Sequence, residues 1–172
     1  KTGRPFIGPS GKLLRATIRD VLGLDDEKDV YITSPVKYLP VKVTPTPKEI
    51  AHGKTHLDKQ LAIVDPKVIV LMGSVAAQGV IGEKIAVKTE HGKVLERNGK
   101  KYFITVHPAA GLRYPPLKET FQEDFQKLRA QAEKELEKPI KEIEEREKQI
   151  AQELEKVRKR TGEELKGAAS KL

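Results

Sequence analysis

The 172-residue sequence contains no cysteine, no tryptophan and a single methionine. Without cysteine, the chain cannot form a disulfide, use a thiol as a nucleophile or bind a metal through thiolates. It also lacks any apolar run near the roughly 20 residues that a membrane-spanning helix needs. Its first residues have the pattern of neither a signal peptide nor a transit peptide. These absences predict a soluble intracellular protein that does not span a membrane.

Positive charge is in excess. The chain has 33 Lys and Arg against 25 Asp and Glu, which gives a net charge of +8 and a pI near 9.5. Such a balance favours polyanionic partners such as nucleic acid, which basic side chains bind through phosphate contacts. Abundant Lys and Glu, together with the absence of cysteine, are typical of proteins from thermophiles.

Residues 1–128 alternate between helical and strand patterns. Apolar spacing and capping residues predict helices over 10–22, 47–64 and 74–80, and a further helix that opens over 117–128. Runs of β-branched and aromatic residues predict strands over 30–33, 67–72 and 102–106. Between them lie a proline-rich loop over 39–47 and a polar hairpin or loop over 87–100, around Gly92 and Asn98-Gly99. The alternation predicts an α/β fold with three αβα layers and a short parallel sheet.

The composition changes over 129–172, where Glu, Lys, Gln, Arg and Leu dominate and a long charged helix is expected. Within 136–161 apolar residues follow a heptad: Leu136, Ile143, Ile150 and Val157 lie seven apart, Ile140 and Leu154 fill the alternate positions, and Glu147 and Thr161 interrupt these. Pro139 is expected to kink the helix or to begin a new one. This extension either pairs with a helix of a second copy or another protein, or folds back on the domain over 1–128.

A histidine lies at the end of the last predicted strand. Residues 106–113 read Val-His-Pro-Ala-Ala-Gly-Leu-Arg, so His107 comes directly after an apolar run and before a proline and small residues. Open α/β sheets bind their ligands at such strand ends. A single His-Pro pair can also do no more than cap a strand, so other segments decide between the two interpretations.

Three further segments support a functional role for this histidine. Residues 3–14 read Gly-Arg-Pro-Phe-Ile-Gly-Pro-Ser-Gly-Lys-Leu-Leu, residues 30–37 read Val-Tyr-Ile-Thr-Ser-Pro-Val-Lys, and residues 66–76 read Pro-Lys-Val-Ile-Val-Leu-Met-Gly-Ser-Val-Ala. Taken in order with 106–113, they resemble the uracil-DNA glycosylase superfamily, and within it the family 4 enzymes of thermophiles. The resemblance covers about residues 3–128, and its specificity comes from four motifs in the correct order.

The resemblance implies an enzyme that hydrolyses the N-glycosidic bond of uracil or a related deaminated base in DNA. Such an enzyme must flip the base out of the helix, hold it and stabilise the departing base anion. By resemblance, Phe6 stacks on the flipped base, although an ordinary core phenylalanine is the alternative. Ser34 contacts the edge of the base. His107 donates a hydrogen bond to a base carbonyl oxygen, whose negative charge grows in the transition state.

Two segments are expected to contact the DNA. In the resemblance, 109–113 enters the minor groove, where Ala109 lies beside the flipped base, Leu112 is a wedge between base steps and Arg113 contacts a phosphate. The turn that contains Gly8, Ser10, Gly11 and Lys12 offers backbone N–H groups and a lysine to another phosphate. This turn lacks the spacing of a nucleotide-binding Walker motif, which argues against an ATPase.

The sequence departs from the family at several positions. Ser34 stands where the family usually has asparagine, so only part of the imide edge of uracil can be read and another deaminated base is an alternative. Gly111 stands where leucine is more common. The family's first motif, which carries the acidic residue that positions the attacking water, has no counterpart from Lys1 onward, and we expect it upstream of the sequence given.

Family 4 enzymes hold a four-iron cluster on four cysteines, and here Tyr38 and Gly53, or the adjacent His52, stand at two of those positions. We therefore expect neither this cluster nor another cofactor. His52 and His56, one helical turn apart, are more easily explained as exposed side chains than as metal ligands. The alternative to an active enzyme is a decayed glycosylase fold that binds DNA or assembles through its helical tail.

Overall fold

The computed structural model describes residues 4–38 and 44–169, without the side chains of Leu136, Lys138 and 160–169. Most of the predicted proline-rich loop lies outside the described residues. The chain divides into two compact units, Lys1–Arg129 and Ala130–Leu172. No helix within the described ranges has both the length and the apolar character to cross a membrane.

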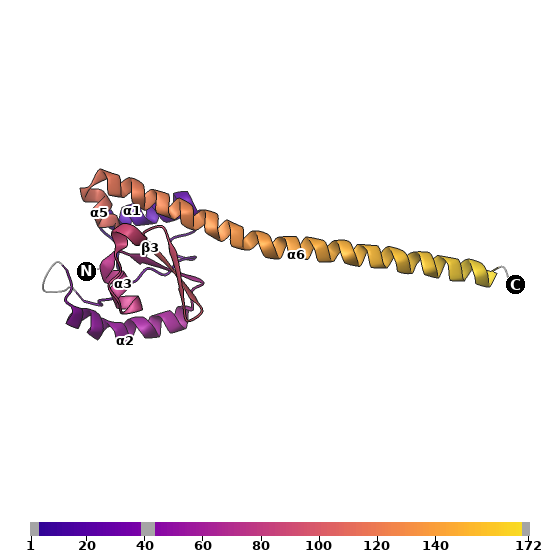
Figure 1. Cartoon of the computed structure of the whole chain (residues 1–172), viewed down its shortest axis with the longest axis horizontal. Helices are drawn as coiled ribbons and strands as arrows, with labels where there is room; N and C mark the ends of the chain where they lie inside the picture. The colour runs from indigo at the N-terminus through magenta and orange to yellow at the C-terminus, as the bar shows by residue number, and fades with distance from the viewer. Residues whose placement is uncertain (1–3, 39–43, 170–172) are drawn as a thin grey trace. The chain divides into compact units, whose positions relative to one another are not determined.

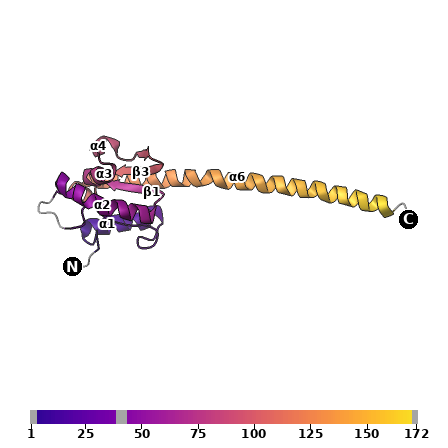
Figure 2. The ribbon, with the colours of Figure 1, turned by 90° about the horizontal axis from the view of Figure 1, so that it is seen from below.

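The first unit contains a three-stranded sheet, which can be followed in Figures 1 and 2. Its strands are β1 (Val68–Met72), β2 (Val94–Arg97) and β3 (Lys100–Thr105), in the order β1-β3-β2. β1 and β3 are parallel, whereas β2 pairs with β3 in an antiparallel hairpin. Asn98 and Gly99 both have positive φ, at 51° and 71°, as a tight two-residue turn requires. The α/β class is confirmed, but the sheet is mixed because this hairpin adds an antiparallel strand.

The strand predicted over 30–33 is wrong, because no described strand pairs with it. Its β-branched residues do indicate burial correctly. Val30 and Ile32, two residues apart, both pack against the main hydrophobic cluster of the first unit. A strand needs a neighbouring backbone to pair with as well as an apolar side to bury. The pattern of side chains indicates burial but not pairing.

Helices surround the sheet. They are α1 (Pro9–Thr17), continued by the π-helical turn η1 (Ile18–Leu22), α2 (Pro47–Val64), α3 (Ser74–Ile81), α4 (Val87–Glu90), α5 (Pro108–Arg113) and α6 (Pro115–Ala169). α2 has the predicted bounds because Thr46 and Glu49 form a capping box at its start. Gly23 ends η1 with a φ of 69°, as predicted for the first helix. Of the two alternatives predicted for the polar segment 87–100, the hairpin is confirmed, because β2 lies within this segment and pairs with β3 across Asn98 and Gly99. The short helix α4, in the same segment, was not predicted.

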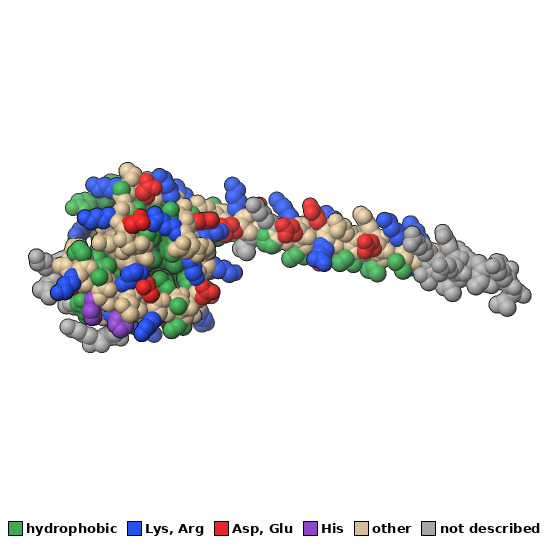
Figure 3. All heavy atoms as spheres, turned by 60° about the horizontal axis from the view of Figure 1, so that its bottom comes forward, with side chains coloured by type: hydrophobic (Ala, Val, Ile, Leu, Met, Phe, Trp, Pro, Cys, Tyr) green, Lys and Arg blue, Asp and Glu red, His purple; other side chains and the backbone are tan. Residues whose placement is uncertain are grey.

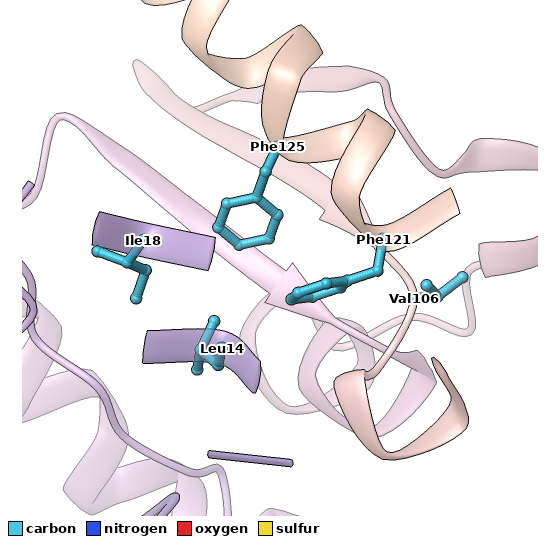
Figure 4. Close-up of a cluster of buried hydrophobic side chains, with 5 residues drawn as sticks. All are labelled: Leu14, Ile18, Val106, Phe121 and Phe125. Carbon is cyan, nitrogen blue, oxygen red and sulfur yellow. The ribbon is translucent and has the colours of Figure 1, made fainter. Parts of the chain in front are cut away.

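The two faces of the sheet are covered by different helices. Val70 and Met72 of β1 pack against a cluster formed by Leu14, Ile18, Val106, Phe121 and Phe125, which come from α1, η1, the end of β3 and α6 (Figure 4). The intervening Ile69 and Leu71 belong to a second cluster with Ala77 of α3 and Ile104 of β3. Alternation of period two therefore places helices on both faces, as three layers require.

A buried carboxylate joins three of these elements. Asp124 of α6 is fully buried, and its Oδ2 accepts a 2.8 Å hydrogen bond from the Thr105 hydroxyl at the end of β3. Its Oδ1 lies 3.0 Å from Nδ1 of His91 and 3.8 Å from Nζ of Lys127. Buried charge is tolerated only with such partners. The end of β3 is thereby fixed to α6.

α6 is one continuous helix through Pro139, so the expectation of a new helix there is wrong. Proline has no backbone N–H to donate, yet the helix continues on both sides of Pro139. Residues 115–129 of α6 belong to the first unit, where Phe121 and Phe125 lie 4.8 Å apart between ring centroids.

Replacing Phe121 with Ala tests the packing of α6 on the sheet. Phe121 is fully buried, so we expect the free energy of unfolding to fall by about 3–5 kcal/mol. Gln122→Ala, at an exposed position of the same helix, is the matched control and should change it by less than about 0.5 kcal/mol. Urea unfolding followed by circular dichroism measures both. Equal small effects in the two variants would contradict the described core.

Candidate functional site

His107 lies at the junction of β3 and α5. It is the N-cap of α5, and its Nδ1 accepts a 3.1 Å hydrogen bond from the backbone N–H of Ala109. An imidazole nitrogen that accepts a hydrogen bond carries no proton, so in the neutral ring the proton is on Nε2. The fold thus presents Nε2–H as a donor. Sequence reasoning placed His107 at a strand end, but the helix after it and this tautomer were not predicted.

Burial lowers the pKa of His107 below its usual value. A half-buried imidazole resists protonation because the charged form loses hydration, and the described structure gives it no carboxylate partner. His107 is therefore neutral at pH 7. A neutral donor can stabilise a developing anion in the same manner as a charged one, with a smaller Coulomb contribution.

Phe6 and His107 are brought together although they are far apart in the sequence. Their rings stack with 5.6 Å between centroids and 29° between planes. Phe6 has a φ of 55°, which is uncommon outside glycine. α1 fits closely behind it, since a Cβ on Gly11 would lie 1.7 Å from the Phe6 carbonyl oxygen. Gly11, predicted as part of a phosphate-binding turn, is required here for the approach of helix and loop.

A second glycine shapes the other side of His107. Gly73 follows β1 with a φ of 85°, and its N–H donates a 2.9 Å hydrogen bond to the Thr105 carbonyl oxygen. A Cβ at this position would lie 3.1 Å from the Cβ of His107. Sequence reasoning gave Gly73 no role of its own. The sequence feature that could have identified Gly73 is its place directly after an apolar strand, where backbones often approach closely.

The two segments expected to contact DNA are neighbours in the structure. α1, which begins after Gly8 and carries exposed Lys12, packs against α5 (Figure 1). On α5, Arg113 is exposed and the Leu112 side chain has 49% of its surface accessible. Ala109 is half-buried. Exposed Ile7 and Tyr114, next to Phe6 and Arg113, were missed by sequence reasoning, although an aromatic residue after an arginine was a signal for Tyr114.

The structure explains why glycine stands at position 111. Gly111 is buried, and a Cβ there would lie 3.0 Å from the Cα of Lys118, on the first turns of α6. A leucine at 111 would therefore push α5 and α6 apart. The neighbouring Leu112, predicted as the wedge, is exposed.

Ser34 belongs to a different set of contacts. Its hydroxyl accepts a 3.4 Å hydrogen bond from the Val36 N–H, and its carbonyl oxygen accepts one of 2.6 Å from Nζ of Lys37. Lys37 also contacts the Thr33 hydroxyl at 2.8 Å, and burial lowers its pKa. The hydrogen bonds and ring contacts of the described residues do not join Ser34 to Phe6 or His107. Lys37 is a basic residue of this motif that the sequence did not single out.

The positions of the family's cluster cysteines do not fit a thiolate-held cluster. The ring of Tyr38 lies edge-on to His52 at 5.9 Å, and a Cβ on Gly53 would lie 2.0 Å from the Pro35 carbonyl oxygen. His52 and His56 are exposed, with 6.5 Å between ring centroids. Within the part of the chain that the structure describes, no three His, Asp or Glu side chains form a metal-binding group.

A cavity of about 310 Å³ lies elsewhere, beside β2 and the segment before α4. Ile85, Val94 and Ile104 form its apolar side, and Lys84 and Arg97 are among its charged residues. Arg97 is already paired with Glu83 at 2.8 Å. Neither Phe6 nor His107 lines this cavity, so it is distinct from the site around them.

Comparison with known proteins agrees with the motifs. A type-4 uracil-DNA glycosylase of Archaeoglobus fulgidus is 39% identical over 135 residues, which are 73% of this chain and 67% of that protein. That of Thermotoga maritima is 37% identical over 140 residues, 78% of this chain and 72% of its own length. That of Sulfurisphaera tokodaii is 35% identical over 141 residues, which are 75% of this chain. The chain spans 62% of the Sulfurisphaera protein.

A family model described as the uracil DNA glycosylase superfamily matches residues 1–133. This match ends close to the boundary between the two compact units, at Arg129. The resemblance seen in the four motifs is therefore confirmed. Because the family model and these relatives match most of its length, this chain belongs to the uracil-DNA glycosylase superfamily.

Proposed function

We propose that the protein acts inside the cell as a DNA glycosylase that hydrolyses the N-glycosidic bond of uracil or a related deaminated base. The observation that carries this proposal is the stacked pair of Phe6 and His107, with the Nε2–H of a neutral imidazole left as a donor. The similar proteins named type-4 uracil-DNA glycosylases support it.

In this mechanism the flipped base stacks on Phe6, within reach of the adjacent imidazole. Nε2–H of His107 donates to a carbonyl oxygen of the base, where negative charge grows as the glycosidic bond breaks. Because the imidazole is already held by Ala109 N–H and by the ring of Phe6, it does not need to reorganise during the reaction. Water then adds to the sugar carbon, one of its protons passes to the departing base, and an abasic site remains. We propose that this hydrolysis uses no cofactor.

The distribution of charge supports DNA as the partner of the first unit. Residues 1–129 contain 22 Lys and Arg against 14 Asp and Glu, whereas residues 130–172 contain 11 of each. The whole excess of +8 therefore lies in the unit that carries Phe6 and His107. Basic residues attract DNA through its phosphates.

We propose that two elements, α5 and the start of α1, contact the DNA. Leu112 at the exposed side of α5 enters between base steps beside Ala109, and Arg113 contacts a phosphate. At the start of α1, the backbone N–H groups of Ser10 and Gly11 and the side chain of Lys12 face a second phosphate. Gly8, the N-cap of α1, has no side chain to satisfy those N–H groups.

The role proposed for residues 136–161 is pairing with another helix. The neutral charge balance of residues 130–172 gives this part of the chain little attraction for DNA, and the apolar heptad within it favours a helical partner. The side chains of Leu136 and Thr161, at the ends of this segment, lie outside the described residues.

A glycosylase assay tests the proposed function. The purified protein is incubated with duplexes that carry a single uracil, hypoxanthine or xanthine, and abasic sites are cleaved with alkali. We expect cleavage at one of these lesions, and the lesion preferred shows what Ser34 reads. Retained DNA binding with no cleavage at any lesion would instead support a decayed, DNA-binding member of the family.

Removing His107 should impair excision. For His107→Ala we expect a loss of about 10²–10³-fold in the single-turnover rate, the usual effect of one donor to a developing anion. His107→Asn is the more specific variant, because asparagine can still cap α5. It therefore removes the imidazole donor while it keeps the helix cap. His56→Ala, at an exposed position of α2, is the control. Near-normal turnover in both His107 variants would remove this residue from the mechanism.

The lowered pKa of His107 predicts a pH dependence of stability. Above the ordinary pKa of 6.5 the imidazole is neutral in both the folded and unfolded states, and its titration contributes nothing. As the pH falls below that value, the unfolded chain takes up a proton that the folded one does not, so folding is disfavoured. We therefore expect the wild type to lose stability relative to His107→Asn between pH 7.5 and 5. Urea unfolding at each pH measures the difference, and an unchanged gap would contradict it.

A further inference from the structure

An apolar stripe runs along α6 in the second unit. It consists of Ile140, Ile143, Ile150, Leu154 and Val157, whose exposed fractions lie between 51% and 64%. Figure 3 shows hydrophobic side chains gathered along one side of this part of the helix and charged side chains along the other. Five large aliphatic residues with half or more of their surface in water are unusual for an isolated helix, and they mark a surface that another element covers.

The spacing of the stripe defines heptad positions. Ile140, Glu147 and Leu154 take position a, and Ile143, Ile150 and Val157 take position d. A repeat of 3.5 residues keeps such a seam on one side of a supercoiled helix, so its complement is a helix with the same repeat. A second copy of this chain provides that repeat, and the charges beside the seam fit a second copy in one orientation only.

We propose that residues 137–158 of two copies pair as an antiparallel coiled coil. The proposal rests on the helix-pairing role given above to 136–161 and is independent of base excision. In this register Ile140 packs against Val157 of the other copy, Ile143 against Leu154, and Glu147 against Ile150. Each of these layers occurs twice, so four of the six layers are wholly apolar.

Glu147 selects between the two orientations. In a parallel dimer, equivalent a positions face each other, and the two Glu147 carboxylates would meet in the seam. Like charges forced together in a partly desolvated seam repel each other strongly. In the antiparallel register each Glu147 lies beside an isoleucine, and its carboxylate can reach past that side chain to water.

The flanking charges agree with the antiparallel register. At g positions, Arg146 of one copy lies opposite Glu153 of the other, and at e positions Glu137 lies opposite Arg158. By symmetry this gives four oppositely charged pairs, and all of these side chains are exposed in the single chain. A parallel dimer would lose these four pairs, would form only the pair of Glu153 with Arg158, and would place Arg146 opposite Ala151.

Cysteine cross-linking tests the orientation, because the chain has no cysteine of its own. Ile143→Cys and Leu154→Cys are prepared as separate full-length proteins and oxidised alone and as an equimolar mixture. We expect a disulfide-linked dimer in the mixture, formed between the two different variants, and little in either protein alone. Efficient cross-linking of each variant with itself would overturn the proposal in favour of a parallel pair.

A charge exchange provides a second test that keeps the seam intact. Arg146→Glu should weaken the dimer, and the double variant Arg146→Glu with Glu153→Arg should restore it, because the exchanged residues face each other across the antiparallel pair. In a parallel pair the Glu153→Arg substitution would instead place a second positive charge opposite Arg158, so the double variant would weaken the dimer further. Sedimentation equilibrium at several concentrations measures the dissociation constant.

Matched controls separate pairing from folding. Ile143→Lys should abolish the dimer, whereas Gln152→Lys, on the opposite side of the same helix, should leave the dissociation constant within about twofold. A wild-type chain that remains monomeric at high concentration, or that dimerises only with a different protein, would overturn the proposal. None of these measurements depends on base excision, so an inactive enzyme that cross-links as expected would contradict only the proposed function.

Discussion

The buried carboxylate of Asp124 is the interaction on which the position of the site depends. It receives the hydroxyl hydrogen bond of Thr105 and lies next to the ring nitrogen of His91, so β3, the turn after α4 and α6 meet at one charged group. Thr105 is two residues before His107, and its carbonyl oxygen also accepts the N–H of Gly73. The end of β3 is thus held from two sides. The donor proposed for base excision, His107, must be kept in place to within fractions of an ångström, and this network supplies that constraint.

Close backbone contacts complete the constraint around the imidazole. Gly11 lets α1 lie directly behind Phe6, and Gly73 lets the end of β1 lie against His107. Larger residues would displace the segments that carry the two rings, because a Cβ at Gly11 would collide with the backbone of Phe6 and a Cβ at Gly73 would crowd the Cβ of His107. Gly11 and Gly73 shape the site because they have no side chain. The hydrogen bond proposed to the base comes from one nitrogen of His107. The same principle operates at Gly111, where α5 and α6 approach.

Local signals predicted local structure well and pairing poorly. Thr46 and Glu49 indicate the start of α2, and Asp65-Pro66 indicates its end. Both bounds of this helix could therefore be predicted to within one residue. Val30–Thr33 has the composition of a strand, but its pairing depends on a neighbour that composition does not contain. The hairpin of β2 and β3 was predicted as one alternative for 87–100, because its turn at Asn98-Gly99 is a local signal. The bounds of β2 were not predicted, because Val94–Arg97 are mostly exposed.

The site shows the same division. Four motifs identified Phe6 and His107 as candidates, yet nothing in either segment indicates that their rings stack or which nitrogen carries the proton. Those facts follow from the packing of α1 against α5 and from the N–H of Ala109. Asp124 is a comparable case. Its burial beside His91 depends on contacts across 33 residues, and in the sequence it is one acidic residue in a charged helix.

The charge of the chain finally separates two kinds of surface. The excess of basic residues lies entirely within 1–129, where the family's motifs and the exposed Leu112 and Arg113 are found. The residues over 130–172 balance their charges and instead order them around an apolar stripe. An excess of positive charge attracts DNA with little regard to register, whereas alternating charge beside a heptad specifies register and orientation. This contrast supports the proposals that the first unit binds DNA and that the second unit pairs with another helix.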